Sequence, residues 1–115
     1  MNLLTIKPAL SRFYSDTPEW AWDKIFEVNV KNAFQLIQET TPYLEETKGN
    51  ITCISSIAGF QPMNLIGVYS VSKTALIGLV KALSFEMAAR DIRINTVCPG
   101  VVRTKLGSKY LVVTR

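Results

Sequence analysis

The sequence predicts an α/β domain built around a pair of parallel strands, and three observations support this fold class. The chain has 115 residues, of which 48% are hydrophobic and 19% are charged, as in one globular domain. Two short runs rich in β-branched residues, 51–54 and 92–98, each follow a helix-like stretch. The segment between these runs has the length of the helix in a strand–helix–strand unit, whose crossover is right-handed and whose strands are parallel.

The first helix is expected to begin at Thr17, which can cap it, with Pro18 in the first helical position. Apolar residues then recur at helical spacing, namely Trp22, Ile25, Phe26, Val30, Ala33, Phe34 and Ile37. We expect this helix to end near Pro42, or to continue weakly to Thr47. The polar and flexible residues 48–50 then stop it.

The remaining elements form the strand–helix–strand unit. The first strand covers 51–54 and ends at Ser55-Ser56. A long helix is predicted over 68–90, because apolar residues recur at helical spacing and small residues allow another helix to approach closely. The second strand covers 92–98 and is closed by Pro99-Gly100. Ligands bind beyond the carboxyl ends of parallel strands, so the chemistry is expected at these two strand ends.

Composition and charge exclude several functional classes. Histidine is absent, which excludes Ser-His-Asp catalysis and histidine-ligated zinc, and two cysteines cannot form a four-cysteine metal site. The net charge of +4 comes from scattered basic residues without neighbouring aromatic platforms, so no nucleic-acid partner is expected. Cys53 and Cys98 are expected to be free thiols in a reducing compartment, with a disulfide as the alternative.

The sequence shows no membrane or export signal. No run reaches the roughly 18 consecutive apolar residues that a membrane span needs, and the apolar stretch at the start is too short for a signal peptide. We therefore expect a soluble intracellular protein without a membrane span. The cytoplasm and an organelle such as the peroxisome or the mitochondrion all fit this expectation.

Tyr69 and Lys73 are the first candidates for chemistry, because they lie four residues apart at the start of the long helix. This spacing places both on one helix face, with Cβ atoms about 5–6 Å apart. The reference pKa of tyrosine is about 10, and a nearby ammonium can lower it by about 1–3. Such a tyrosine can exchange a proton with an alcohol or a carbonyl. The alternative is a packed tyrosine beside a lysine whose stem covers apolar surface.

Two further polar residues occupy informative positions. Ser56 follows the first strand, 13 residues before Tyr69, where its hydroxyl can hydrogen-bond a substrate oxygen or simply cap backbone groups of the loop. Asn29 lies on the apolar stripe of the first helix, where an amide without partners costs about 1–3 kcal/mol. Asn29 can hold a water molecule, mark a helix kink or be a satisfied core amide.

Together these motifs resemble the short-chain dehydrogenase/reductase family and follow the family's order. The resemblance rests on the segments Phe26-Glu27-Val28-Asn29-Val30, Ile54-Ser55-Ser56-Ile57-Ala58-Gly59, Tyr69-Ser70-Val71-Ser72-Lys73, Arg93-Ile94-Asn95 and Pro99-Gly100-Val101-Val102-Arg103-Thr104. Within the family the chain looks most like NADP-dependent carbonyl and retinal reductases. The resemblance implies the C-terminal part of a Rossmann-like doubly wound parallel sheet, in truncated form.

The resemblance also implies roles in hydride transfer between NAD(P)(H) and an alcohol or carbonyl substrate. Tyr69 would be the general acid/base, and Lys73 would tune it and hydrogen-bond the nicotinamide ribose. Ser56 would orient the carbonyl, and Asn29 would hold a water in a proton relay to Lys73. The cofactor would be NADP, or alternatively NAD, and its nicotinamide end would contact Tyr69, Lys73, Pro99, Gly100 and Thr104.

The sequence departs from the family at both ends. Residues 1–115 are expected to form a single partial domain, because the Gly-rich turn that cradles the pyrophosphate and the family's final strand are missing. An alternative function is therefore a catalytically inactive fragment that acts as a dimerisation or regulatory module. The expected partners are a small carbonyl or alcohol substrate and further copies or relatives, which would bind through the two long helices.

Overall fold

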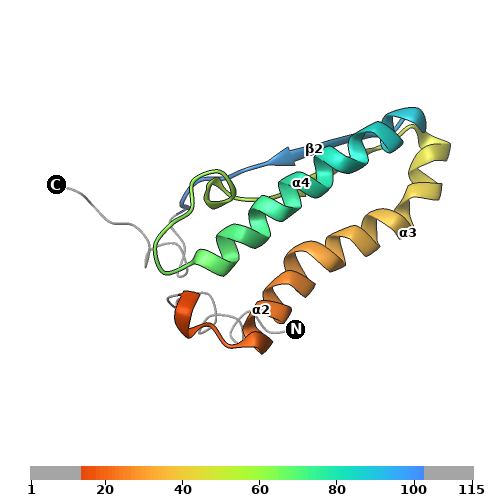
Figure 1. The fold of residues 1–115 in the computed structure, drawn as a ribbon. Helices are drawn as coiled ribbons and strands as arrows, with labels where there is room; N and C mark the ends of the chain where they lie inside the picture. The colour runs from red at the N-terminus through yellow and green to blue at the C-terminus, as the bar shows by residue number, and fades with distance from the viewer. Residues whose placement is uncertain (1–13, 103–115) are drawn as a thin grey trace.

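The computed structural model describes residues 14–102, which form helices and a two-stranded parallel sheet (Figure 1). In chain order the elements are η1 (Tyr14–Asp16), α2 (Glu19–Phe26), the π-helical η2 (Glu27–Lys31), α3 (Asn32–Thr47), β1 (Asn50–Ile54), η3 (Ile57–Gly59), α4 (Gly67–Ala89) and β2 (Arg93–Val97). The expected strand–helix–strand unit is therefore confirmed, and its bounds agree closely with the expectation.

The sheet pairs β1 with β2 in parallel, from Asn50 opposite Arg93 to Ile54 opposite Val97. Both long helices pack on one face of this sheet (Figure 1). The core there joins Ile37 of α3, Cys53 of β1, and Leu76 and Val80 of α4. Side chains alternate along a strand, so Ile54 and Val97 point to the opposite face, where they are exposed.

The first helix differs from the expectation because it is interrupted by η2. Of the two expected ends, the structure shows the later one, since the helix continues through Pro42 to Thr47. The helix survives Pro42 because the residues before it are anchored: Thr41, next to the proline, is buried, and Ile37, one turn earlier, belongs to the core. It ends at Lys48, which adopts a left-handed backbone conformation with a φ of 50°.

The start of α2 also differs in detail from the expectation. The N-cap is Pro18 and not Thr17, and the first helical residue is Glu19. A second core cluster, made of Ala21, Ile25 and Val68, joins α2 to the first turn of α4. This contact holds η2 beside the first turns of α4, which carry the expected catalytic pair.

Within residues 14–102, α4 is the one helix that is long and apolar enough to cross a membrane by length and composition. Core helices of soluble proteins share this property. In this structure α4 carries Val68, Leu76 and Val80, which belong to the two core clusters. Cys53 and Cys98 are free thiols, as expected, and the first is buried and the second half-buried.

Candidate active site

Tyr69 and Lys73 meet on the first turns of α4, as their spacing predicts. Both side chains are half-buried, and Lys73 Nζ lies 5.6 Å from the centroid of the Tyr69 ring. The same ammonium donates a hydrogen bond of 2.9 Å to the backbone carbonyl of Ile54, the last residue of β1. The pair therefore lies at the carboxyl end of a parallel strand, where ligands are expected.

Burial lowers the pKa of Lys73, because its charged form loses hydration, and the nearby Cys53 and Cys98 partly oppose this shift. Burial also raises the pKa of the Cys53 thiol, against the influence of Lys73. The proton of Lys73 is thus held less tightly than that of a surface lysine. A lysine of this kind can respond to charge that develops on a neighbouring group.

Asn29 lies in the middle of η2 and points to α4. Its Nδ2 donates a hydrogen bond of 3.0 Å to Ser72 Oγ, and that hydroxyl donates one of 2.7 Å to the backbone carbonyl of Tyr69. Ser72 is fully buried, at 0% exposure. Asn29 is therefore a hydrogen-bonded amide within a π-helical segment, which agrees with the structural interpretations of this residue.

Ser56 follows β1 directly and caps η3. Its Oγ accepts a hydrogen bond of 3.1 Å from the backbone N–H of Ala58, so the capping alternative is observed. A hydroxyl that accepts in this way keeps its own proton for another partner. The loops after the two strands are joined, since the N–H of Ile57 donates to the carbonyl of Pro99.

The other expected cofactor contacts lie at the end of β2. A Cβ added to Gly100 would meet nothing within 4 Å, so there is open space beside this residue. Thr104 lies outside the described residues. Direct contacts therefore connect Tyr69 and Lys73, and Ser72 bridges Asn29 to Tyr69. Ser56 approaches this group only through its loop.

Several residues that the sequence reasoning missed hold this site together. Ser55 is buried and donates a hydrogen bond of 2.8 Å to the carbonyl of Lys73. Thr74 donates one of 2.7 Å to the carbonyl of Gly59, and a Cβ at Gly59 would lie 3.0 Å from backbone atoms of Lys73. The one signal for these residues in the sequence was their small size, and small size by itself predicted only that another helix could approach closely.

Comparison with known proteins agrees with this geometry. The family model described as short chain dehydrogenase matches residues 9–111. The human protein "Dehydrogenase/reductase SDR family member 2, mitochondrial" is 48% identical over 94 residues, which are 82% of this chain and 34% of that protein. Bovine "Dehydrogenase/reductase SDR family member 4" is 41% identical over 108 residues, which are 90% of this chain and 39% of that protein.

Solved structures show the same likeness. A 4-hydroxyisoleucine dehydrogenase mutant complexed with NADH and succinate superimposes with a TM-score of 0.81 and 30% identity, over 92% of this chain and 44% of that one. A putative NAD(P)-dependent gluconate 5-dehydrogenase from Beutenbergia cavernae, with bound NADP, gives a TM-score of 0.80 and 26% identity, over 88% of this chain and 41% of that one.

This likeness confirms the fold class, which corresponds to part of a Rossmann-like α/β sheet. The chain spans 34–44% of the length of these relatives. Its match to the family model, however, covers most of its own residues. The order of the fold elements and the paired Tyr69 and Lys73 agree with that match. The chain therefore belongs to the short-chain dehydrogenase/reductase family.

Proposed function

We propose that the site belongs to an oxidoreductase that transfers hydride between NAD(P)(H) and an alcohol or carbonyl substrate. The observation that carries the proposal is the bonded group at the carboxyl end of β1. In this group Lys73 lies against the Tyr69 ring, and Ser72 links Asn29 to the same turn. Family membership supports the reaction class, and solved relatives hold NADH or NADP.

Each residue has a role in this reaction. Tyr69 gives a proton to the substrate oxygen in the direction of reduction, and takes it back in the direction of oxidation. The ammonium of Lys73, beside the ring, attracts the phenolate that is left. The free proton of the Ser56 hydroxyl can bond the substrate oxygen and orient it. Asn29 holds a water molecule that reprotonates the site through Lys73.

The residues at the strand ends fit the nicotinamide end of a dinucleotide. Lys73 has three N–H donors and uses one of them on Ile54, so two remain for ribose hydroxyls. The open space at Gly100 leaves room beside Pro99, and Thr104 completes this set in the proposal. When bound, the nicotinamide supplies the hydride. NADP is proposed from the resemblance to carbonyl and retinal reductases, with NAD as the alternative.

The test is hydride transfer by the full chain. NADPH oxidation is measured with a dicarbonyl or with retinal as the substrate, at millimolar NADPH, and the Tyr69→Phe variant is expected to lose all turnover. Tyr43→Phe is the matched control, because Tyr43 lies on α3 and is 70% exposed. Equal rates in the two variants would refute the assignment of Tyr69.

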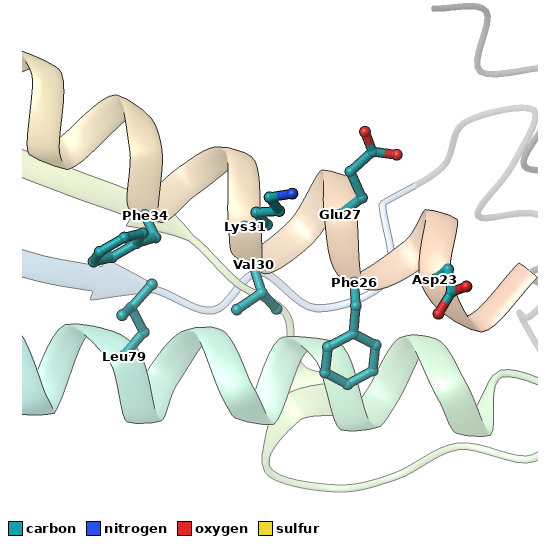
Figure 2. A pocket seen from close by; sticks show the side chains of 7 residues that line it. All are labelled: Asp23, Phe26, Glu27, Val30, Lys31, Phe34 and Leu79. Atoms are coloured by element: carbon teal, nitrogen blue, oxygen red, sulfur yellow. The ribbon is translucent and has the colours of Figure 1, made fainter. Parts of the chain in front are cut away.

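A second function, a dimerisation or regulatory module without turnover, is favoured by the apolar surface that the helices expose. A groove of about 550 Å³ runs between α4 and the continuous stretch from α2 through η2 to the start of α3, and Figure 2 shows Phe26 and Val30 pointing across it toward α4. Phe34 and Leu79 line one end of the groove, while Glu27 points away from α4 (Figure 2). Farther along α4, Phe85 is 84% exposed.

Apolar surface of this kind on two long helices fits a homo- or hetero-oligomer. Sedimentation at several protein concentrations tests this, and Phe85→Ser is expected to shift the equilibrium to monomer. Co-purification with a full-length relative, in the absence of any NADPH binding, would favour this function over the enzyme. We propose a soluble intracellular compartment for either function. The name of the human family member 2 protein places that relative in the mitochondrion, and this chain is not assigned to a particular compartment.

A further inference from the structure

Ser72 is a buried hydroxyl that connects two elements of the site. It is fully buried, at 0% exposure, and it precedes Lys73 on α4. Its Oγ accepts from Asn29 Nδ2 at 3.0 Å and donates to the carbonyl of Tyr69 at 2.7 Å. The bond to Asn29 joins residues that are 43 positions apart in the chain, so it is a tertiary contact and not a local turn.

This bond determines which end of the Asn29 amide faces α4. An asparagine side chain has a donor NH₂ group and an acceptor oxygen. The Ser72 hydroxyl has one proton, which it gives to the Tyr69 carbonyl, so toward Asn29 it can only accept. It therefore selects the NH₂ end of Asn29 and leaves the amide oxygen for another partner.

The surroundings indicate where that oxygen is useful. Asn29 and Lys73 both line a groove with a volume of about 460 Å³ that runs beside β1. An acceptor and an ammonium in one groove are suited to share a water molecule. A reversed amide would place two donors, its own NH₂ and the lysine, around the same space.

We infer that Ser72 is a positioning residue of this site, whose hydroxyl fixes the orientation of the Asn29 amide relative to the helix turn that carries Tyr69 and Lys73. The inference rests on the proposed function for its chemical purpose. The positional statement itself can be tested without turnover. If Ser72 served only as a small packing residue, alanine would replace it without any effect on Asn29.

The first test compares Ser72→Ala with Ser70→Ala. Ser70 is the matched control, because it is also fully buried on α4, but its hydroxyl accepts only from the backbone N–H of Met63, at 3.5 Å. Ser72→Ala is expected to shift the side-chain NH₂ resonances of Asn29 in a ¹⁵N spectrum, and Ser70→Ala is expected to leave them in place. Unmoved Asn29 resonances in Ser72→Ala would overturn the inference.

The second test is a double-mutant cycle on unfolding. Asn29→Ala in the wild-type background is expected to raise the unfolding constant about fivefold through the lost hydrogen bond, and less than about twofold once Ser72 is alanine. In the Ser70→Ala background the effect of Asn29→Ala should keep its full size. Ser72→Thr keeps the hydroxyl and is expected to restore the coupling. An additive cycle for Asn29 and Ser72 would overturn the inference.

These outcomes separate the inference from the proposed function. A coupled cycle in a chain without turnover supports the position of Ser72 and contradicts the oxidoreductase. Turnover with an additive cycle supports the oxidoreductase and contradicts the role of Ser72. Where turnover is present, Ser72→Ala is expected to lower kcat about tenfold or more with little change in KM, because it removes an interaction of the reacting groups and not of substrate binding.

Discussion

Replacing Gly59 with alanine probes the contact that holds η3 against α4. A Cβ at Gly59 would lie 3.0 Å from the backbone carbon and oxygen of Lys73 and 3.0 Å from Cδ1 of Ile77, against 3.4–4 Å for ordinary contact. The Lys73 carbonyl already accepts a hydrogen bond of 2.8 Å from Ser55, so it cannot retreat without weakening that bond. Overpacking of a core in this way costs about 1–3 kcal/mol, and we expect that loss in the free energy of unfolding.

Gly78→Ala is the matched control and is expected to have the opposite sign. Gly78 lies within α4 and is exposed, and a Cβ there would meet nothing within 4 Å. Alanine inside a helix is more favourable than glycine by about 0.5–1 kcal/mol. Both variants are compared with wild type by urea unfolding followed by circular dichroism, at several protein concentrations. Gly59→Ala as stable as wild type, or Gly78→Ala less stable, would refute the packing described for η3 and α4.

Three further predictions follow from single residues. Lys48→Gly should raise the unfolding free energy, measured by urea titration, by up to about 1 kcal/mol, because the left-handed conformation of Lys48 is strained for a residue with a Cβ. The ion pair between Lys48 and Asp91, which this change removes, is exposed and therefore contributes little. The difference in unfolding free energy between the wild type and Lys73→Met should rise with pH up to about 10.4. Burial lowers the pKa of Lys73 in the folded chain, so the unfolded chain binds more protons in this range. A difference that stays flat or falls with pH would contradict this. In calorimetric titration the chain should bind NADPH more weakly than micromolar, because its sequence contains no Gly-rich pyrophosphate turn; tighter binding would overturn this view.

The elements that the sequence predicted well are those with a local cause. The apolar spacing of α4 and the β-branched runs of β1 and β2 placed all three elements close to their observed bounds. The first helix was harder, because the causes of its irregularities lie elsewhere in the chain. The continuation through Pro42 depends on burial against the core, and η2 holds Asn29 against Ser72. The amide of Asn29 on the apolar stripe indicated an irregularity, but the local pattern does not identify Ser72 as its partner.

The same division holds for the site. The residue types and spacing predicted Tyr69 and Lys73 as neighbours, and the structure confirms it. The links that fix their turn were not predicted, since Ser55 and Gly59 act on the backbone of Lys73 from the loop after β1. Small residues make such contacts because they are small, and their type says nothing about the partner. The role of Ser56 stays a prediction, since only its capping bond is described.

Lys73 has a structural task beside its chemical one, and this affects how its variants are interpreted. The N–H of Ser55 donates to Val97 of β2, and backbone groups alternate along a parallel strand, so the carbonyl of Ile54 faces the other edge of β1. Lys73 supplies the donor for that carbonyl. Removing the lysine would take away this side-chain bond and leave the carbonyl to water, so a loss of activity would mix a change at the end of β1 with the chemical role of the lysine.

Tyr69→Phe therefore gives a cleaner test of the proposed chemistry than any change at Lys73. Within residues 14–102 the Tyr69 hydroxyl has no hydrogen-bond partner, and the bond from Ser72 reaches only its backbone carbonyl. Phenylalanine keeps the ring, the carbonyl and the contact with the Lys73 ammonium, and removes a group that supports no other element. Loss of turnover with unchanged unfolding would then report on proton transfer, whereas loss of both would indicate that the phenol has a structural role.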